Sequence, residues 1–167
     1  MACYTISECV LLSIGEDGQD DIITDLLNVV LQKGNSHQIA IDKCGTIKNK
    51  YTEIAQTYEF RIKVAIINWL EWMAKRDRKW EYVDIEDASD NIFLEVCCKT
   101  ADKKLIVYSE NKWNNGKSTD RPYSHKGILI TILNKDEAIL ELQPKTINAI
   151  NSIVVTDGIA INPTLKS

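Results

Sequence analysis

The stretch DASDNIFLEVCCKTADKKLIVYSE (residues 87–110) carries the pattern on which the fold class depends. Asp90 stands before a run of apolar residues that predicts a helix over about 89–100. A short polar turn follows, and the apolar run at 104–108 predicts a buried strand. Glu110 comes directly after that strand. The stretch therefore predicts a helix and a strand with an acidic residue at each end.

The rest of the chain continues this alternation of helices and strands. Short apolar runs bounded by glycine or aspartate predict strands, and apolar residues three or four positions apart predict helices. We expect strands at 9–14, 37–42, 104–108 and 127–133, and either a short strand or an extended linker at 80–84. We expect helices at about 20–31, 47–55, 59–75, 89–100 and 136–142, and a loop at 111–126. This order predicts an α/β fold, a three-layer sandwich with a mostly parallel central sheet.

Size and composition restrict the class of protein. With 167 residues the chain is long enough for one domain with its own hydrophobic core. We assign 1–142 to this domain and treat 143–167 as a C-terminal extension whose structure the pattern leaves ambiguous. The net charge of −4 argues against a protein that coats nucleic acid by bulk electrostatics. It still allows an enzyme that contacts a few phosphates through a local patch.

The cysteines and the N-terminus bear on the cellular compartment. The five cysteines are odd in number and include no CxxC pair, which favours reduced thiols in a cytosol over a disulfide framework or a zinc site. Glu8 follows closely on the first apolar residues, and no basic segment precedes them, which does not fit a signal peptide. No apolar run reaches the length of a membrane span. We expect a cytoplasmic protein without a membrane partner.

Acidic residues follow several of the expected strands or precede the helix at 89–100. The carboxyl ends of parallel strands meet at one edge of a sheet, where the ligand crevice of such folds lies. Magnesium prefers oxygen ligands, and two such ions can hold the attacking and leaving oxygens of a phosphodiester. The candidate ligands are Glu16, Asp17, Asp42, Asp87, Asp90 and Glu110. The alternative for each residue taken alone is structural, because Asp42, Asp87 or Asp90 can cap a helix and the others can be solvated loop acids.

Three segments resemble the PIN-like nuclease domains of toxin–antitoxin modules and other bacterial ribonucleases. IAIDKCGTIKNKY (39–51) resembles the second strand and following helix of one subgroup. ASDNIFLEVCCKTADKKLIVYSENKW (88–113) resembles the central helix led by an Asp, the strand after it and the acidic turn. KGILITILNKDEAILEL (126–142) resembles the closing strand and last helix. The resemblance implies a PIN-like domain over 1–142 with a site for magnesium or manganese formed by Asp90, Asp17, Asp42 and Glu110, the catalytic residues.

The acidic positions of this chain depart from the family pattern in part. Asp90 stands where the motif has an Asp. No Asp comes directly after the expected first strand, and Asp17 is one of the nearest acids. Lys50 stands where the subgroup has an acid, and a lysine puts a cation where a metal ion would bind. The acid after the fourth strand would fall near Ser109, where Glu110 is the neighbour.

The polar segment at 111–126 combines basic and aromatic residues. Basic side chains beside aromatic ones can hold phosphates and stack bases, and the segment is long for a loop in a compact domain. A solvated surface loop is the alternative. We predict that nucleic acid would contact Lys112, Trp113, Lys117, Arg121 and Lys126.

The sequence leaves three hypotheses for function. The first is a metal-dependent nuclease, most simply a ribonuclease acting on RNA or DNA as a toxin or defence effector that an inhibitor protein holds in check. The second is a catalytically inactive PIN-like subunit that mediates protein–protein interaction in a larger complex, motivated by Lys50 and Ser109. The third is an unrelated α/β domain whose acids are caps and surface groups. Self-association is compatible with all three.

Overall fold

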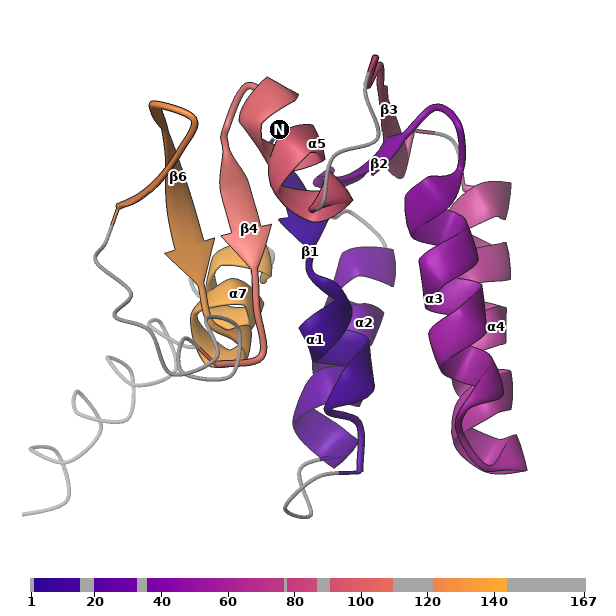
Figure 1. The fold of residues 1–167 in the computed structure, drawn as a ribbon. Coiled ribbons are helices and arrows are strands. Elements are labelled where there is room, and N and C mark those ends of the chain that lie inside the picture. Colours follow the sequence, from indigo (N-terminus) through magenta and orange to yellow (C-terminus); the bar gives the residue numbers. More distant parts are fainter. Residues whose placement is uncertain are drawn as a thin grey trace, which may run out of the picture.

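The central sheet is the organising element of the structure, a computed structural model that describes residues 2–15, 20–32, 36–76, 78–86, 91–109 and 122–143. Six strands of these residues form one sheet in the order β3-β2-β1-β4-β6-β5. Figure 1 shows the part of this order from β3 to β6. They are β1 (Cys3–Ile6), β2 (Gln38–Asp42), β3 (Trp80–Val83), β4 (Lys104–Ile106), β5 (Tyr123–His125) and β6 (Ile128–Leu133).

The sheet is parallel except at one edge. β1 pairs in parallel with both β2 and β4, and the strands β3 and β6 extend the parallel sheet on either side. Among the strands of the described residues, only β5 is antiparallel, and it pairs with β6. Thr5 lies opposite Leu105 in this register, and both residues are fully buried. The predicted mostly parallel α/β sheet is confirmed, and β1 lies at its centre.

Helices pack against the sheet and against one another. They are α1 (Glu8–Leu12), α2 (Asp20–Leu31), α3 (Thr46–Gln56), α4 (Phe60–Lys75), α5 (Ile92–Lys99) and α7 (Lys135–Leu142). α5 lies in front of the strands in Figure 1 and contacts β1, β2, β4 and β6. α7 lies behind the lower ends of β4 and β6 and packs against α2. This arrangement is compatible with three layers. None of the helices described has both the length and the apolar character needed to cross a membrane.

The helix α5 is buried almost all round, which explains its composition. Its buried residues include Phe93, Val96, Cys97 and Cys98, so the two cysteines act as small hydrophobic side chains. Burial raises the pKa of the Cys97 thiol to about 12, with a further contribution from Cys98. The helix begins at Ile92 and not near residue 89, where the sequence predicted its start. Its capping residue is Asn91, whose side chain accepts from the backbone N–H of Leu94 at 3.2 Å.

The first strand was predicted in the wrong place. Cys9–Ile14 does not form a strand, because α1 occupies Glu8–Leu12 and the strand precedes it at Cys3–Ile6. Val10 and Leu11 are fully buried, and a short buried helix gives the same continuous apolar run as a buried strand. The apolar run therefore has no periodicity that could distinguish a short buried helix from a buried strand. Glu16 and Asp17 consequently follow a helix and not the first strand.

Part of the expected loop at 111–126 belongs to the sheet. Tyr123–His125 forms β5 and turns into β6 through Lys126 and Gly127, whose φ angles are 49° and 80°. Two consecutive residues with positive φ match the two-residue hairpin turn whose twist suits adjacent strands. The ambiguous segment 80–84 is a strand, β3. The extension at 143–167 lies outside the described residues except for Gln143.

A cluster of aromatic rings joins the helices to the sheet. Tyr51 of α3 has its ring centroid 6.1 Å from that of Trp69 on α4 and 6.0 Å from that of Phe93 on α5. The ring of Trp69 meets that of Trp80 on β3 edge to face at 5.9 Å. Edge-to-face and offset rings at such distances add to the stabilisation from burial. The cluster fixes the position of α3, whose first turn reaches the carboxyl end of the sheet.

Candidate functional site

A cleft of about 350 Å³ lies at the carboxyl ends of β1, β2 and β3. Its polar lining comes from Glu8 after β1, Asp42 at the end of β2, Thr46 and Lys50 on α3, Glu86 after β3 and Asn91 before α5. Cys44, Ile85, Ile92 and Phe93 complete the lining. The position agrees with the expectation that ligands of parallel α/β sheets bind at this edge.

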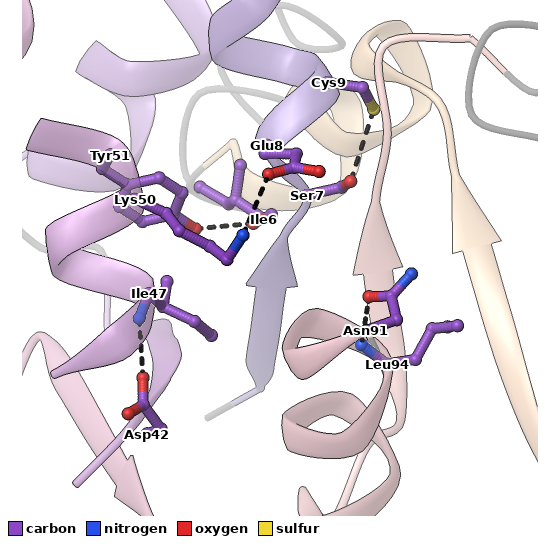
Figure 2. A network of polar contacts seen from close by, with 10 residues as sticks. All are labelled: Ile6, Ser7, Glu8, Cys9, Asp42, Ile47, Lys50, Tyr51, Asn91 and Leu94. Atoms are coloured by element: carbon purple, nitrogen blue, oxygen red, sulfur yellow. Dashed lines mark hydrogen bonds and ion pairs between the residues drawn. The ribbon is translucent and has the colours of Figure 1, made fainter. Parts of the chain in front are cut away.

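The carboxylate of Asp42 holds the start of α3. Asp42 is 2% exposed, and its two oxygens accept from the backbone N–H groups of Thr46 at 2.7 Å and Ile47 at 2.8 Å. Figure 2 shows the hydrogen bond from Ile47. Burial by itself raises the pKa of this carboxyl, but the N–H groups of Ile47 and Thr46 and the Thr46 hydroxyl outweigh it, so the pKa lies below its usual value. These are the contacts of the helix-capping alternative.

A lysine and a glutamate face each other across the cleft. Nζ of Lys50 on α3 lies 3.8 Å from Oε2 of Glu8 at the start of α1 (Figure 2). The two side chains are 41% and 44% exposed, so the pair contributes little to stability. Its importance is its position, because it places an ammonium group beside the carboxylate nearest to the end of the central strand.

Hydrogen bonds hold the backbone of this region in place. The Tyr51 hydroxyl donates to the carbonyl of Ile6 at 2.5 Å, which ties α3 to the end of β1 (Figure 2). Burial raises the pKa of this fully buried hydroxyl, with smaller contributions from Cys9 and Glu8. The backbone N–H of Ser7 donates to the carbonyl of Ile106 at 2.8 Å. The residues after β1 therefore lie beside the end of β4.

Only one of the four acids predicted to bind metal falls in the described residues. Asp42 lines the cleft, as just described. Asp17, Asp90 and Glu110 lie outside the described residues. The capping residue Asn91, which follows Asp90 in the chain, lines the cleft. Within the described part of the chain, no group of three His, Cys, Asp or Glu residues lies close enough together to hold a metal ion.

Two acids of the cleft escaped the sequence analysis. Glu8 was missed because the first strand was expected after it, so it was not recognised as the acid that follows β1. The available signal was the segment CYTI at 3–6, whose Tyr, Thr and Ile favour strands. Glu86 was missed because 80–84 had been left open between strand and linker, so the acids after it were considered only as residues that precede the helix at 89–100.

The one described residue of the predicted nucleic-acid surface is engaged with an acid. Nζ of Lys126 lies 2.6 Å from Oε1 of Glu95 on α5, and Nε2 of His125 lies 3.0 Å from the same oxygen. Lys126 sits in the turn of the β5–β6 hairpin, at the edge of the sheet opposite β3. Lys112, Trp113, Lys117 and Arg121 lie outside the described residues.

Comparison with protein families, with curated proteins and with solved structures gives no match to this chain. A functional argument therefore rests on the cleft and on the surface of the molecule.

Proposed function

We propose that this chain is a PIN-like domain that has lost cleavage and works as a subunit mediating protein–protein interaction. The observation that carries the proposal is the ion pair of Lys50 and Glu8 in the cleft. A divalent cation bound to Glu8 would have to displace the ammonium group or tolerate it at short distance, where like charges repel strongly. The lysine thus opposes the metal that hydrolysis of a phosphodiester would need.

The state of Asp42 supports the same proposal. Each of its oxygens already accepts a backbone N–H of α3, and those donors would lose their acceptor if the carboxylate turned toward a metal. Ser7, directly after β1, is 5% exposed and carries no charge. The described residues nearest to the ends of β1 and β2 therefore favour a polar binding cleft over a metal centre.

The surface of α4 supports a role in protein binding. Phe60 is 81% exposed and Trp72 is 53% exposed. Large aromatic side chains on a surface are typical of residues that anchor a protein partner.

A metal-dependent nuclease is the second candidate, and one observation favours it. Glu8, Asp42 and Glu86 bring carboxylates to the cleft, and Asn91 brings the chain there one residue after Asp90. With Asp17 and Glu110 added, they would bind magnesium or manganese and cut RNA or DNA as a toxin or defence effector. In that case Lys50 would have to leave Glu8 when the metal binds.

Metal calorimetry combined with a cleavage assay separates the two candidates. Manganese and magnesium are titrated into the full chain and into Asp90→Asn, and single-stranded RNA and DNA are incubated with each protein and metal. We expect no metal binding that depends on Asp90 and no cleavage. The control is Asp25→Asn, because Asp25 is an exposed residue of α2 outside the cleft.

Tight metal binding that is lost in Asp90→Asn and retained in Asp25→Asn, together with metal-dependent cleavage, would overturn the inactive-subunit proposal. That result would establish the nuclease instead.

A further inference from the structure

Within the described part of the chain, the strand β3 leaves one edge of the sheet unpaired. It is the last strand in the order and pairs with β2 on its other side (Figure 1). Among the described elements, β2 is the one that contacts β3 along its length. Tyr82, in the second half of β3, is 51% exposed. The edge of a sheet presents N–H and C=O groups to which another strand can add.

The register with β2 shows which backbone groups of β3 face outward. The backbone N–H of Ile39 on β2 donates to the carbonyl of Lys79 at 2.9 Å, which fixes the alternation along the strand. In a parallel ladder every second residue bonds to the neighbouring strand, so the odd-numbered residues of β3 bond to β2. The N–H and C=O groups of Trp80 and Tyr82 therefore point away from β2, toward the open edge.

A second copy of β3 matches this edge when it runs antiparallel with Tyr82 opposite Tyr82. The two tyrosines then exchange both N–H···O bonds, and Trp80 of one copy lies opposite Asp84 of the other. A pairing centred on Glu81 would put two carboxylates directly opposite each other, which destabilises a sheet. A pairing centred on Val83, the last residue of β3, would extend well beyond the strand. The pairing centred on Tyr82 avoids both, and its facing rings add to the stability.

The charges along the edge are complementary to themselves in this pairing. The side chains of Trp80, Tyr82 and Asp84 lie on one face, because side chains alternate along a strand. On that face Nζ of Lys48 lies 3.2 Å from the Tyr82 hydroxyl and 5.2 Å from the centroid of the Trp80 ring. Since Asp84 of the second copy lies opposite Trp80, its carboxylate comes close to this ammonium group.

Both charged groups are available for a contact between copies. No carboxylate of the described residues forms an ion pair with Lys48. Asp84 lies 3.0 Å from Lys43, but the two side chains are 72% and 56% exposed, so that ion pair is weak. The carbonyl of Asp84 accepts from Nζ of Lys99 at 2.8 Å and keeps a second lone pair for a bond to a strand.

From these observations we propose that β3 pairs with β3 of a second copy of the chain, antiparallel and centred on Tyr82. The two sheets become one continuous sheet, and Lys48 of each copy contacts Asp84 of the other. A two-fold axis brings the same patch together with itself, so the dimer adds no further copies. One pair of short strands is a small interface, so the share of dimer should rise with protein concentration. The proposal is independent of whether the cleft cleaves nucleic acid, because β3 does not line the cleft.

Sedimentation velocity of the full chain over a range of concentrations tests the pairing. We expect a monomer–dimer equilibrium for the unsubstituted chain. Lys48→Glu and Asp84→Lys each bring like charges together in a dimer of identical copies, so each should weaken dimerisation about ten-fold or more. An equimolar mixture of the two variants should restore it, because the mixed dimer joins opposite charges at both contacts.

Two further variants complete the test. Lys63→Glu is the matched control, since it makes the same charge change on α4, away from β3, and should leave dimerisation unchanged. Tyr82→Pro removes an N–H that points away from β2, so it should abolish the dimer while the circular dichroism stays the same.

A chain that stays monomeric at every concentration would overturn the proposal. A mixture of the charge variants that is no more dimeric than either variant alone would overturn it as well. A dimer that survives Tyr82→Pro and is lost in Trp72→Ala would assign the interface to the exposed surface of α4 instead.

Discussion

Asp42 shows how one side chain can belong to a cleft and still serve the fold. Its carboxylate lies at the end of β2 and accepts the first free N–H groups of α3. Those N–H groups have no partner within the helix, so an acceptor from outside stabilises the helix start. One of the residues that the sequence predicted to bind metal therefore also determines where α3 begins.

We expect Asp42→Ala to destabilise the protein by about 1–3 kcal/mol at neutral pH, because two backbone N–H groups, of which that of Ile47 is buried, lose their acceptor. The pKa of Asp42 is lowered by folding, so its contribution is present above the unfolded value of about 3.9 and is lost as pH falls through the folded pKa. Urea unfolding at pH 6 and pH 3 measures both effects. The difference in the free energy of unfolding between the unsubstituted chain and Asp42→Ala should be smaller at pH 3 than at pH 6. An equal difference at both pH values would contradict the link between stability and the ionisation of Asp42. Asp25→Ala is the exposed control.

Lys50→Glu tests whether the lysine sets the metal affinity of the cleft. The change replaces an ammonium group 3.8 Å from Glu8 with a second carboxylate. We expect manganese to bind at least ten times more tightly than to the unsubstituted chain, as measured by calorimetry. Lys63→Glu makes the same charge change on α4 outside the cleft and should leave the affinity unchanged. Equal affinities for the two variants would show that the local cation is not what limits metal binding.

The turn of the β5–β6 hairpin has a lysine, Lys126, at a position where asparagine would be more favourable. Lys126 has a φ of 49°, a left-handed conformation that asparagine adopts more readily than lysine. The following Gly127, with a φ of 80°, already has the residue that such a turn prefers. The Lys126 side chain that contacts Glu95 is 64% exposed, whereas the Glu95 side chain is 16% exposed and also contacts His125, so the acid keeps a partner when the lysine is replaced.

We expect Lys126→Asn to stabilise the protein by up to about 1 kcal/mol, because relief of the left-handed backbone exceeds the loss of the lysine contact to a carboxylate that His125 still contacts. Lys126→Ala is the matched control, since it removes the same ion pair and keeps the unfavourable φ. Thermal unfolding of the two variants distinguishes them. If alanine proved as stable as asparagine, backbone strain at this turn would not be the cause.

At the scale of the whole molecule, one hydrophobic core extends across the sheet from β3 to β6. Buried residues run from Trp80 on β3 through Ile6 on β1 to Ile132 on β6 and form a single cluster. A core of this kind predicts that the elements unfold together.

Ile132→Ala on β6 tests this cooperativity with probes on the opposite side of the sheet. Ile132 is 1% exposed, and we expect a loss of about 2–5 kcal/mol from the cavity left behind. The tryptophan fluorescence, to which the buried Trp69 and Trp80 contribute, and the far-ultraviolet circular dichroism should shift to the same lower urea midpoint. Leu129→Ala on the same strand removes a side chain that is 60% exposed and should change little. Separate midpoints for the two probes would contradict a single cooperative core.

The sequence by itself determined the elements that have a clear period. The helices α2 and α4 and the strands β2 and β6 lie where apolar spacing and flanking polar residues predicted them, because those signals are local. The first strand was not recoverable in this way, since the buried helix α1 and a buried strand share one apolar pattern. An error of a few residues there moved the acid after β1 from Glu8 to Asp17.

Only the tertiary structure decided what the cleft contains. The sequence could place acids near strand ends, but it could not show that Lys50 meets Glu8 or that α3 engages both oxygens of Asp42. Those contacts depend on the distance between segments that pair through the sheet, and the position of α3 depends on rings of four different elements. The local pattern of apolar and polar residues therefore determined where most helices and strands lie. The packing of segments that are distant in the sequence determined which charged side chains face one another.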